Sequence, residues 1–196
     1  PASAPATAGV SASASPAATA SASAPAAAPV IDLSKAPELL DEGGKALPQT
    51  NDRPSVESPA FRARMDRLWL AIVKNDAAIA EGVFFPVVAY EQVKDIEKPA
   101  ADHKHRLSKA FARNIKEYHE AIGPEPEAAK LLGVDVDDAR VKWMEPGKEG
   151  NKLGYWRVTR SKIRYRDAGG TDKTLELTSL ISWRGEWFVV HLHGFK

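Results

Sequence analysis

The spacing of the apolar residues changes once along this chain, and that change constrains the fold more than any other feature. Apolar side chains recur at helical spacing between residues 58 and 132, whereas from about residue 139 they alternate with polar ones. Alternation with a period of two is typical of strands that bury one face. Helices followed by consecutive strands predict an α+β fold, in which N-terminal helices pack on an antiparallel sheet of about four strands.

The helical part begins with a strong start signal. Ser58 is a good N-cap, and Pro59 suits the first helical position. Later breaks come at residues 75–76, at the Phe-Phe-Pro run of residues 84–86, and at Gly123. We also predict a short extended piece at residues 87–90 and a solvated start of the long helix at residues 102–105. The helices are predicted over residues 58–74, 76–84, 100–122 and 127–132.

The strands are separated by pairs of turn-forming residues at positions 146–147, 169–170 and 184–185. They are predicted over residues 139–144, 153–165, 174–183 and 186–192. The third predicted strand has the clearest alternation. One of its faces is expected to carry Leu175, Leu177, Ile181 and Trp183.

The first 29 residues contain only Ala, Ser, Pro, Thr, Gly and Val. Such a segment cannot bury enough apolar surface to offset the entropy lost on ordering, and its prolines interrupt any helix. We therefore predict a disordered spacer over residues 1–29, a linker over residues 30–57 and a folded domain over residues 58–196. An incidental low-complexity tail is the alternative interpretation of the first segment.

The composition excludes several classes of function. The 27 basic and 26 acidic residues give a net charge of +1, which does not fit a general polyanion binder, so nucleic acid is not an expected partner. The chain has no cysteine, which excludes disulfides, thiol catalysis and Cys-based zinc sites. Without an apolar run of about 18 residues, membrane contact is expected only through an N-terminal anchor that has been removed. We expect no cofactor and no metal.

The segment 185–193, Gly-Glu-Trp-Phe-Val-Val-His-Leu-His, carries the most specific resemblance. It is similar to the closing strand of SnoaL-like and kinase-association-type members of the NTF2-like superfamily. With two short helices ending in Phe-Phe-Pro, a longer helix and a meander, the chain resembles this superfamily over about residues 60–193. The resemblance implies a sheet curved into a cystatin-like cone. The superfamily includes enzymes, ligand binders and assembly domains, so the resemblance does not select a function.

Other segments are similar to bacterial envelope proteins. The runs Trp143-Met-Glu-Pro-Gly and Ser179-Leu-Ile-Ser-Trp look like an uncharacterised group of lipoprotein-type envelope proteins of myxobacteria. The Ala/Ser/Pro spacer resembles the stretch that follows a signal peptide or a lipidated cysteine. Since the chain begins at Pro1, we infer that an upstream segment has been removed. The expected location is extracytoplasmic in a bacterium: the periplasm, the outer envelope or the medium.

His191 and His193 lie two positions apart on the last predicted strand, and therefore on the same face. Ligand binding, acid–base work, a metal site and a purely structural role are all open, although no third metal ligand is evident. A two-residue turn at residues 184–185 or 185–186 would place both histidines opposite Ile181 and Trp183. A three-residue turn would reverse this arrangement.

Two further sets of side chains are candidates for binding. Arg160, Lys162, Arg164 and Arg166 recur at period two and line one strand face, which suits an anionic partner or a solvated outer face with Glu176 as cross-strand partner. The second set consists of aromatic and polar residues that a cone-shaped fold would bring together near its open end. There they would either line a ligand pocket or form part of the core. The members of this set are Trp69, Tyr90, Tyr155, Arg157 and Trp183.

The function predicted from these features is a non-catalytic domain, tethered to the envelope or secreted, that binds an unknown small molecule or an envelope protein. The first alternative is a SnoaL-like enzyme of isomerase or hydrolase type. It would use His191 or His193 as general base, with Arg157 or Tyr155 stabilising an oxyanion. The second alternative is assembly into a homodimer through the sheet.

Overall fold

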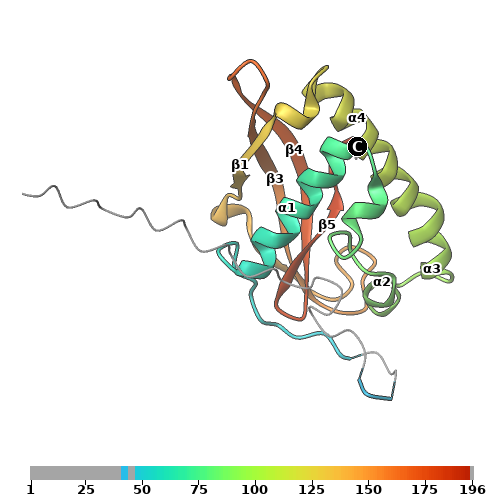
Figure 1. The fold of residues 1–196 in the computed structure, drawn as a ribbon. Coiled ribbons are helices and arrows are strands. Elements are labelled where there is room, and N and C mark those ends of the chain that lie inside the picture. Colours follow the sequence, from blue (N-terminus) through green and yellow to red (C-terminus); the bar gives the residue numbers. More distant parts are fainter. Residues whose placement is uncertain (1–40, 44–46, 195–196) are drawn as a thin grey trace, which may run out of the picture.

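The computed structural model describes residues 41–43 and 47–194, so the predicted spacer and part of the predicted linker lie outside the described residues. The described chain has the predicted α+β architecture. Its helices pack against one strongly curled antiparallel sheet that forms a half-barrel (Figure 1). No helix in this part of the chain is long and apolar enough to cross a membrane.

Helix α1 (Pro59–Lys74) begins where the sequence predicts. Ser58 Oγ accepts a hydrogen bond from Phe61 N at 3.1 Å, and Asn75 ends the helix in the left-handed region with a φ of 52°. The apolar residues that recur at helical spacing along it are buried: Phe61, Met65, Leu68, Trp69, Ile72 and Val73. The next element is shorter than the helix expected over residues 76–84: it is a single 3₁₀ turn, η1 (Ala77–Ala80), capped by Asp76 as predicted.

Helix α2 (Val87–Val93) shows that the extended piece predicted at residues 87–90 is wrong. The strand preference of its Val and Tyr residues is overridden because the helix buries one side, including Tyr90, in the protein interior. The extended residues lie just before the helix instead. There Phe85 N donates to Val189 O at 2.9 Å and adds a short parallel segment to the last strand.

The long helix predicted over residues 100–122 is present as three consecutive parts. They are α3 (Pro99–Asp102), the π-helical turn η2 (His103–Ser108) and α4 (Lys109–Ile122). Its start is not fully solvated, contrary to the prediction, since His103 is only 8% exposed. His103 Nε2 donates to Phe85 O at 2.7 Å, a tertiary contact that spacing along a helix does not reveal.

Strand β1 (Lys130–Asp135) replaces the small helix predicted over residues 127–132, and only a 3₁₀ turn, η3 (Pro126–Ala128), precedes it. Apolar spacing does not separate a short helix from a short strand, and here antiparallel pairing with β3 decides. The sheet therefore has one strand more than predicted. A 3₁₀ turn, η4 (Asp138–Arg140), takes up the beginning of the first predicted strand. The other strands lie close to their predicted positions: β2 (Lys142–Met144), β3 (Tyr155–Arg166), β4 (Asp172–Trp183) and β5 (Glu186–His191).

The strand order is β1-β3-β4-β5, with β2 also paired to β3. β1 pairs with the C-terminal half of β3 and β2 with its N-terminal end, while β4 runs along the other edge. The predicted two-residue turn joins β4 to β5, because Trp183 pairs with Glu186. Arg184 and Gly185 both have positive φ, at 50° and 75°, as a tight hairpin turn requires.

The alternation of the long strands is interrupted at the same level of β3, β4 and β5. In β5, Val190 is an extra residue between Val189 and His191, which pair with consecutive residues of β4. In β3, Arg160 lies in the left-handed region with a φ of 62° and is skipped in the ladder to β4. Such irregularities bend and twist a strand. Their alignment accounts for the strong curl of the sheet.

The buried apolar residues form two cores. The larger core joins α1 and α4 to β3, β4 and β5, and the smaller core lies around α2. Leu175 and Leu177 belong to the larger core, whereas Ile181 and Trp183 belong to the smaller one. The prediction that these four share one face is therefore wrong, because the interrupted alternation turns over the second half of β4.

The segment 47–57, placed in the predicted linker, contacts the sheet. Gln49 Nε2 donates to Ser182 O at 3.1 Å, and its Oε1 accepts from Arg184 N at 2.7 Å. Trp156 Nε1 donates to Asn51 O at 2.9 Å. These hydrogen bonds join the segment to the ends of β3 and β4.

Candidate functional site

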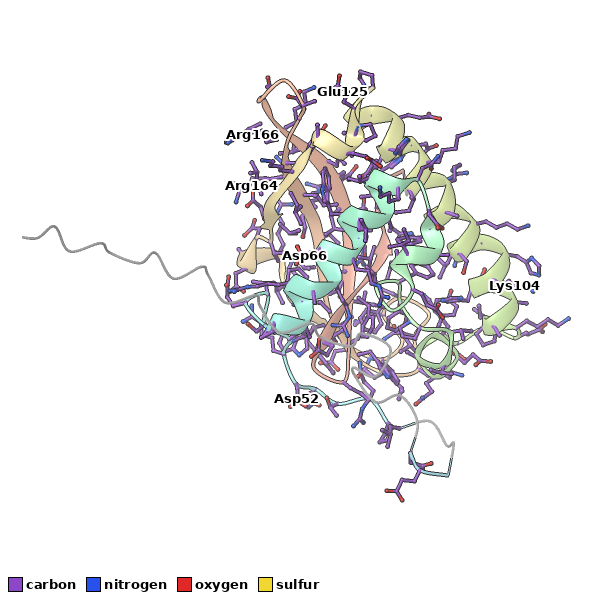
Figure 2. All side chains as sticks on the ribbon, viewed as in Figure 1. Asp52, Asp66, Lys104, Glu125, Arg164 and Arg166 are labelled. Carbon is purple, nitrogen blue, oxygen red and sulfur yellow. The ribbon has the colours of Figure 1, made fainter. Side chains whose placement is uncertain are left out.

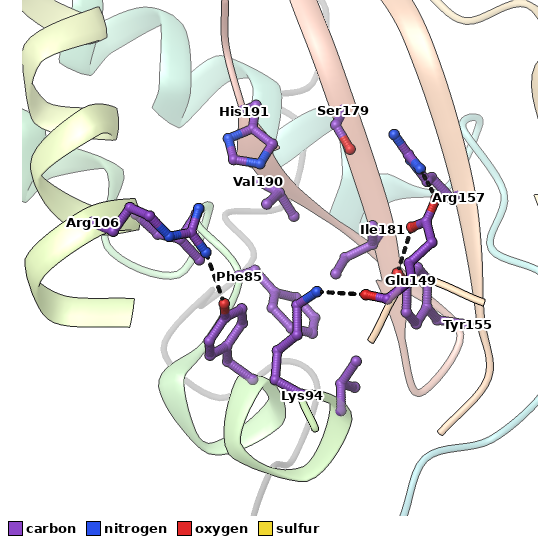
Figure 3. Close-up of a pocket in the computed structure, with 13 residues that line it drawn as sticks. Phe85, Lys94, Arg106, Glu149, Tyr155, Arg157, Ser179, Ile181, Val190 and His191 are labelled. Carbon is purple, nitrogen blue, oxygen red and sulfur yellow. Dashed lines mark hydrogen bonds and ion pairs between the residues drawn. The ribbon is translucent and has the colours of Figure 1, made fainter. Parts of the chain in front are cut away.

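A cavity of about 350 Å³ lies between α2, η2 and strands β3, β4 and β5 (Figure 3). We call it the first cavity. Part of its lining is apolar and belongs to the smaller core, including Phe85, Leu107 and Ile181. The polar part of the lining comes from every surrounding element and consists of Tyr90, Lys94, Arg106, Glu149, Tyr155, Arg157, Ser179 and His191.

Arg106 is fixed by a hydrogen-bonded group on the helical side of the first cavity. Its guanidinium donates to Asp102 from Nε at 2.8 Å and from Nη2 at 2.7 Å. Tyr90 OH donates to Asp102 Oδ2 at 2.6 Å and accepts from Arg106 Nη2 at 3.1 Å. The hydrogen bonds from Arg106 lower the pKa of Asp102 to about 2, while burial raises the pKa of Tyr90. Asp102 is therefore ionised and Tyr90 neutral at pH 7.

Glu149 holds a second group on the sheet side of the first cavity. Its carboxylate accepts a hydrogen bond from Tyr155 OH at 2.8 Å and forms an ion pair with Arg157. Burial raises the pKa of the Tyr155 hydroxyl, and the hydrogen bond to Glu149 raises it further. Tyr155 and Arg157 are thus held in place by one carboxylate from the loop between β2 and β3.

Lys94 lies between these two groups, at the C-terminal end of α2 (Figure 3). Its Nζ donates to the backbone carbonyl of Glu149 at 3.1 Å. It forms no ion pair with any residue in the described ranges 41–43 and 47–194. Burial lowers the pKa of Lys94, and the negative charge of Glu149 offsets this effect only in part.

His191 enters the first cavity because of the extra residue in β5. With strict alternation after the two-residue turn, His191 would lie on the same face as Trp187 and Val189, opposite Ile181. The extra residue Val190 turns it to the face of Ile181 instead. Burial lowers the pKa of His191 to about 4, and the positive charges of nearby basic groups, first Arg106, lower it as well. The imidazole is therefore neutral at pH 7.

His193 does not share this cavity. Its Nε2 lies 2.6 Å from Glu117 Oε2, and its ring stacks on Tyr118 with centroids 5.1 Å apart. The structure thus separates the two histidines that the sequence predicts on one face. No group of three or more His, Asp or Glu side chains in the described chain is arranged to hold a metal ion.

The predicted aromatic and polar set is divided between the cavity and the cores. Tyr90, Tyr155 and Arg157 line the first cavity together. Trp69 instead packs against Tyr165 in the larger core, with ring centroids 5.3 Å apart. Trp183 is fully buried in the smaller core.

The predicted basic stripe is also divided. Arg164 and Arg166 project from the molecule (Figure 2) and pair with Asp135 at 2.8 Å and Asp172 at 2.6 Å. Lys162 is exposed and lies opposite Glu176 in the register, as predicted. Arg160 departs from this row because of its left-handed backbone.

Lys94, Arg106 and Glu149 are the charged cavity residues that the sequence analysis misses. Asp102 and Arg106 lie one helical turn apart, and this i,i+4 spacing is a local signal of their ion pair. No comparable local signal marks Lys94 or Glu149, since they meet only through the tertiary fold.

Comparisons with protein-family models, with curated proteins and with solved structures find no match to this chain. The resemblance to the NTF2-like superfamily therefore stays a prediction, as does the resemblance to envelope proteins.

Proposed function

We propose that the first cavity binds a small anionic ligand with an apolar body, and that the domain acts as a binding domain rather than a catalyst. The observation that carries the proposal is the excess of positive charge in a half-apolar cavity. Three cationic side chains, Lys94, Arg106 and Arg157, line it together with the single carboxylate of Glu149. A ligand that carries one carboxylate would complement this lining.

The excess charge belongs to Lys94. Arg106 is neutralised by Asp102 and Arg157 by Glu149, whereas Lys94 forms no ion pair with the residues that the structure describes. A half-buried ammonium of this kind gains more from an anionic partner than one in water does, because the surroundings screen the attraction less. Burial, together with the positive charges nearby, keeps His191 neutral, so it adds no further positive charge to the lining.

The size and the apolar part of the lining favour a small organic molecule over an inorganic ion. Ligand cavities in proteins are usually about 300–1,000 Å³ and mostly apolar, with a few polar groups that fix orientation. The first cavity, at about 350 Å³, lies at the small end of this range. Phe85, Leu107 and Ile181 supply the apolar contact for the body of such a ligand.

Octanoate and 1-octanol form a matched pair of probes, because they differ in charge and share an apolar chain. We expect octanoate to bind at least about ten-fold more tightly to the full chain in isothermal titration calorimetry, which corresponds to about 1.4 kcal/mol. Lys94→Met should remove this preference. Lys104→Met, which removes an exposed lysine of η2, should keep it. Equal affinities for the two probes would argue against the proposal.

A SnoaL-like catalytic function is the second candidate, favoured by one observation. His191, Tyr155 and Arg157 line the same cavity, and a neutral His191 is able to accept a proton. Against it, the Tyr155 hydroxyl and the Arg157 guanidinium are already bound to Glu149. Mass spectrometry of a ligand recovered after long incubation separates the two functions, because a binding domain returns the ligand unchanged.

We also propose that the domain works outside the cytoplasm of a bacterium, tethered or secreted. The support is the composition of residues 1–29, which suits a spacer. Fractionation of cells that express the full-length protein tests this. Recovery only in the cytoplasm would count against the proposed location and leave the proposed ligand class untouched.

A further inference from the structure

A second cavity, of about 390 Å³, shares Arg157 with the first cavity and is formed by η4, β2 and β3. We call it the second cavity. Four of its lining side chains are cationic: Arg140, Lys142, Arg157 and Arg160. Thr159 adds a hydroxyl group, and no carboxylate of the described chain lines it. Its lining is therefore much more positive than that of the first cavity.

Two of the four cations have no counter-charge in the part of the chain that the structure describes. Arg140 Nε lies 2.9 Å from Asp137 Oδ2, and Arg157 pairs with Glu149. Lys142 and Arg160, by contrast, form no ion pair and no side-chain hydrogen bond within residues 41–43 and 47–194. Like charges that converge on one concavity raise its positive potential and attract anions.

The backbone of β3 is bent in a way that brings Arg160 to this cavity. Arg160 has a φ of 62°, a region that residues with a Cβ rarely adopt. As a result Thr159 and Arg160, although consecutive, both line the second cavity. A conformation of this kind is maintained only where the surrounding structure requires it, and it is often found at functional sites.

We propose that the second cavity binds a multiply charged oxyanion, the phosphate group of a small phosphate-bearing molecule. The planar guanidinium of Arg160 can donate two parallel hydrogen bonds to phosphate oxygens, and Lys142 supplies a compact positive charge beside it. Arg140 and Arg157 add further donors, and the Thr159 hydroxyl adds one more. The site is separate from the function proposed for the first cavity and does not depend on it.

Titration of the full chain with inorganic phosphate and with pyrophosphate, at constant ionic strength, tests the proposal by two-dimensional NMR. We expect saturable binding, tighter for pyrophosphate because it carries more charge, with shifts at Thr159 and Arg160. Arg160→Asn removes the cation but keeps a residue that tolerates the left-handed region. We expect this variant, and Lys142→Gln, each to weaken pyrophosphate binding by about five-fold or more, as the loss of a charge-assisted hydrogen bond predicts.

Lys162→Gln is the matched control. Lys162 is an exposed cation two residues further along β3 that lies outside the second cavity. Its loss should change pyrophosphate affinity by less than about two-fold, as expected for a screened surface charge. Equal losses in Arg160→Asn and Lys162→Gln would show a general effect of surface charge and would overturn the site, and so would the absence of saturable binding. Should Arg160→Asn fail to fold, the comparison of Lys142→Gln with Lys162→Gln decides.

Discussion

The two cores of this domain both take residues from β4 and β5 but differ in what they border. In the larger core, helices α1 and α4 close over the strands, and its side chains pack on one another. The smaller core borders the first cavity, where Lys94, Arg106 and Arg157 lie within reach of its apolar side chains. The difference indicates that the larger core mainly stabilises the fold. The smaller core packs less completely, because some of its side chains border the charged first cavity.

The largest expected effect comes from truncating a leucine in each core. Leu177, in the larger core, and Leu107, in the smaller, are 0% and 2% exposed. Leu→Ala substitutions in cores cost about 2–5 kcal/mol, and more where the site cannot collapse. We expect Leu177→Ala to lower the free energy of unfolding near the upper end of that range. Leu107→Ala should lie near the lower end, since Leu107 already borders open space. Urea unfolding measures the loss in the free energy of unfolding for each variant. Equal losses would contradict the difference between the two cores.

The next effect compares two ion pairs. Arg64 is completely buried and pairs with Glu186, whereas Arg157 is 33% exposed and pairs with Glu149. Removing one partner of a buried pair costs about 3–5 kcal/mol, whereas a solvated pair is worth about 0–1 kcal/mol. Chemical unfolding should therefore show a loss near 3 kcal/mol for Glu186→Ala and a smaller loss, about 1–2 kcal/mol, for Glu149→Ala, which also removes the acceptor of the Tyr155 hydroxyl.

The same pair of variants also separates stability from binding. Glu149→Ala leaves Arg157 without its carboxylate and should tighten octanoate binding in the first cavity. Glu186→Ala should leave octanoate affinity unchanged as long as the domain is folded. A loss of octanoate binding in Glu149→Ala would contradict the assignment of that cavity to an anion.

A smaller effect concerns pH. The pKa of His191 is lowered from 6.5 to about 4 in the folded domain, so the unfolded chain binds this proton more readily than the folded one. The contribution of His191 to the free energy of unfolding should therefore fall as the pH drops from about 6.5 towards 4. Urea unfolding across this window should show a shallower pH dependence for His191→Gln. His105→Gln, at an exposed position of η2, should keep the wild-type slope.

The smallest effect is expected at the outer surface of β3. Arg164 pairs with Asp135, and the two side chains are 48% and 54% exposed. Exposed ion pairs of this kind contribute at most about 1 kcal/mol. Arg164→Gln should change the thermal unfolding midpoint by less than Leu177→Ala, Leu107→Ala or Glu186→Ala. It should also leave pyrophosphate and octanoate binding as they are, and a clear loss of either would show that the predicted basic stripe acts as a unit.

Much of the fold could be predicted from the sequence where local signals are strong. Ser58 and Pro59 mark the start of α1, and the Arg184-Gly185 pair marks the turn before β5. The misses share one cause, which is that tertiary contacts decide them. β1 is a strand because it pairs with β3, and residues 87–90 are helical because α2 buries one side against the smaller core.

Only part of the candidate site could be predicted, because tertiary contacts also decide which side chains meet there. Tyr90, Tyr155 and Arg157 line the first cavity together, and Tyr90 and Tyr155 also belong to the smaller core, so their role in binding a ligand stays a prediction. The alternation of polar and apolar residues predicts side-chain faces only as long as a strand is regular. It therefore misplaced His191, which lies beyond the extra residue Val190, and it gave no reason to select Lys94 or Glu149, which lie outside the strands.

The extra residue in β5 gives this part of the chain a place that can absorb a change in length. Deleting Val190 would leave Val189 and His191 adjacent, and since these two already pair with consecutive residues of β4, His191 would still lie opposite Ser179 and face the first cavity. Leu192 would likewise keep its place in the larger core. A single insertion or deletion in the regular part of the strand, between residues 186 and 189, would instead exchange core for cavity lining beyond it. Among related chains, the residue at position 190 is therefore free to be lost, whereas the number of residues between the turn and Val189 should not change.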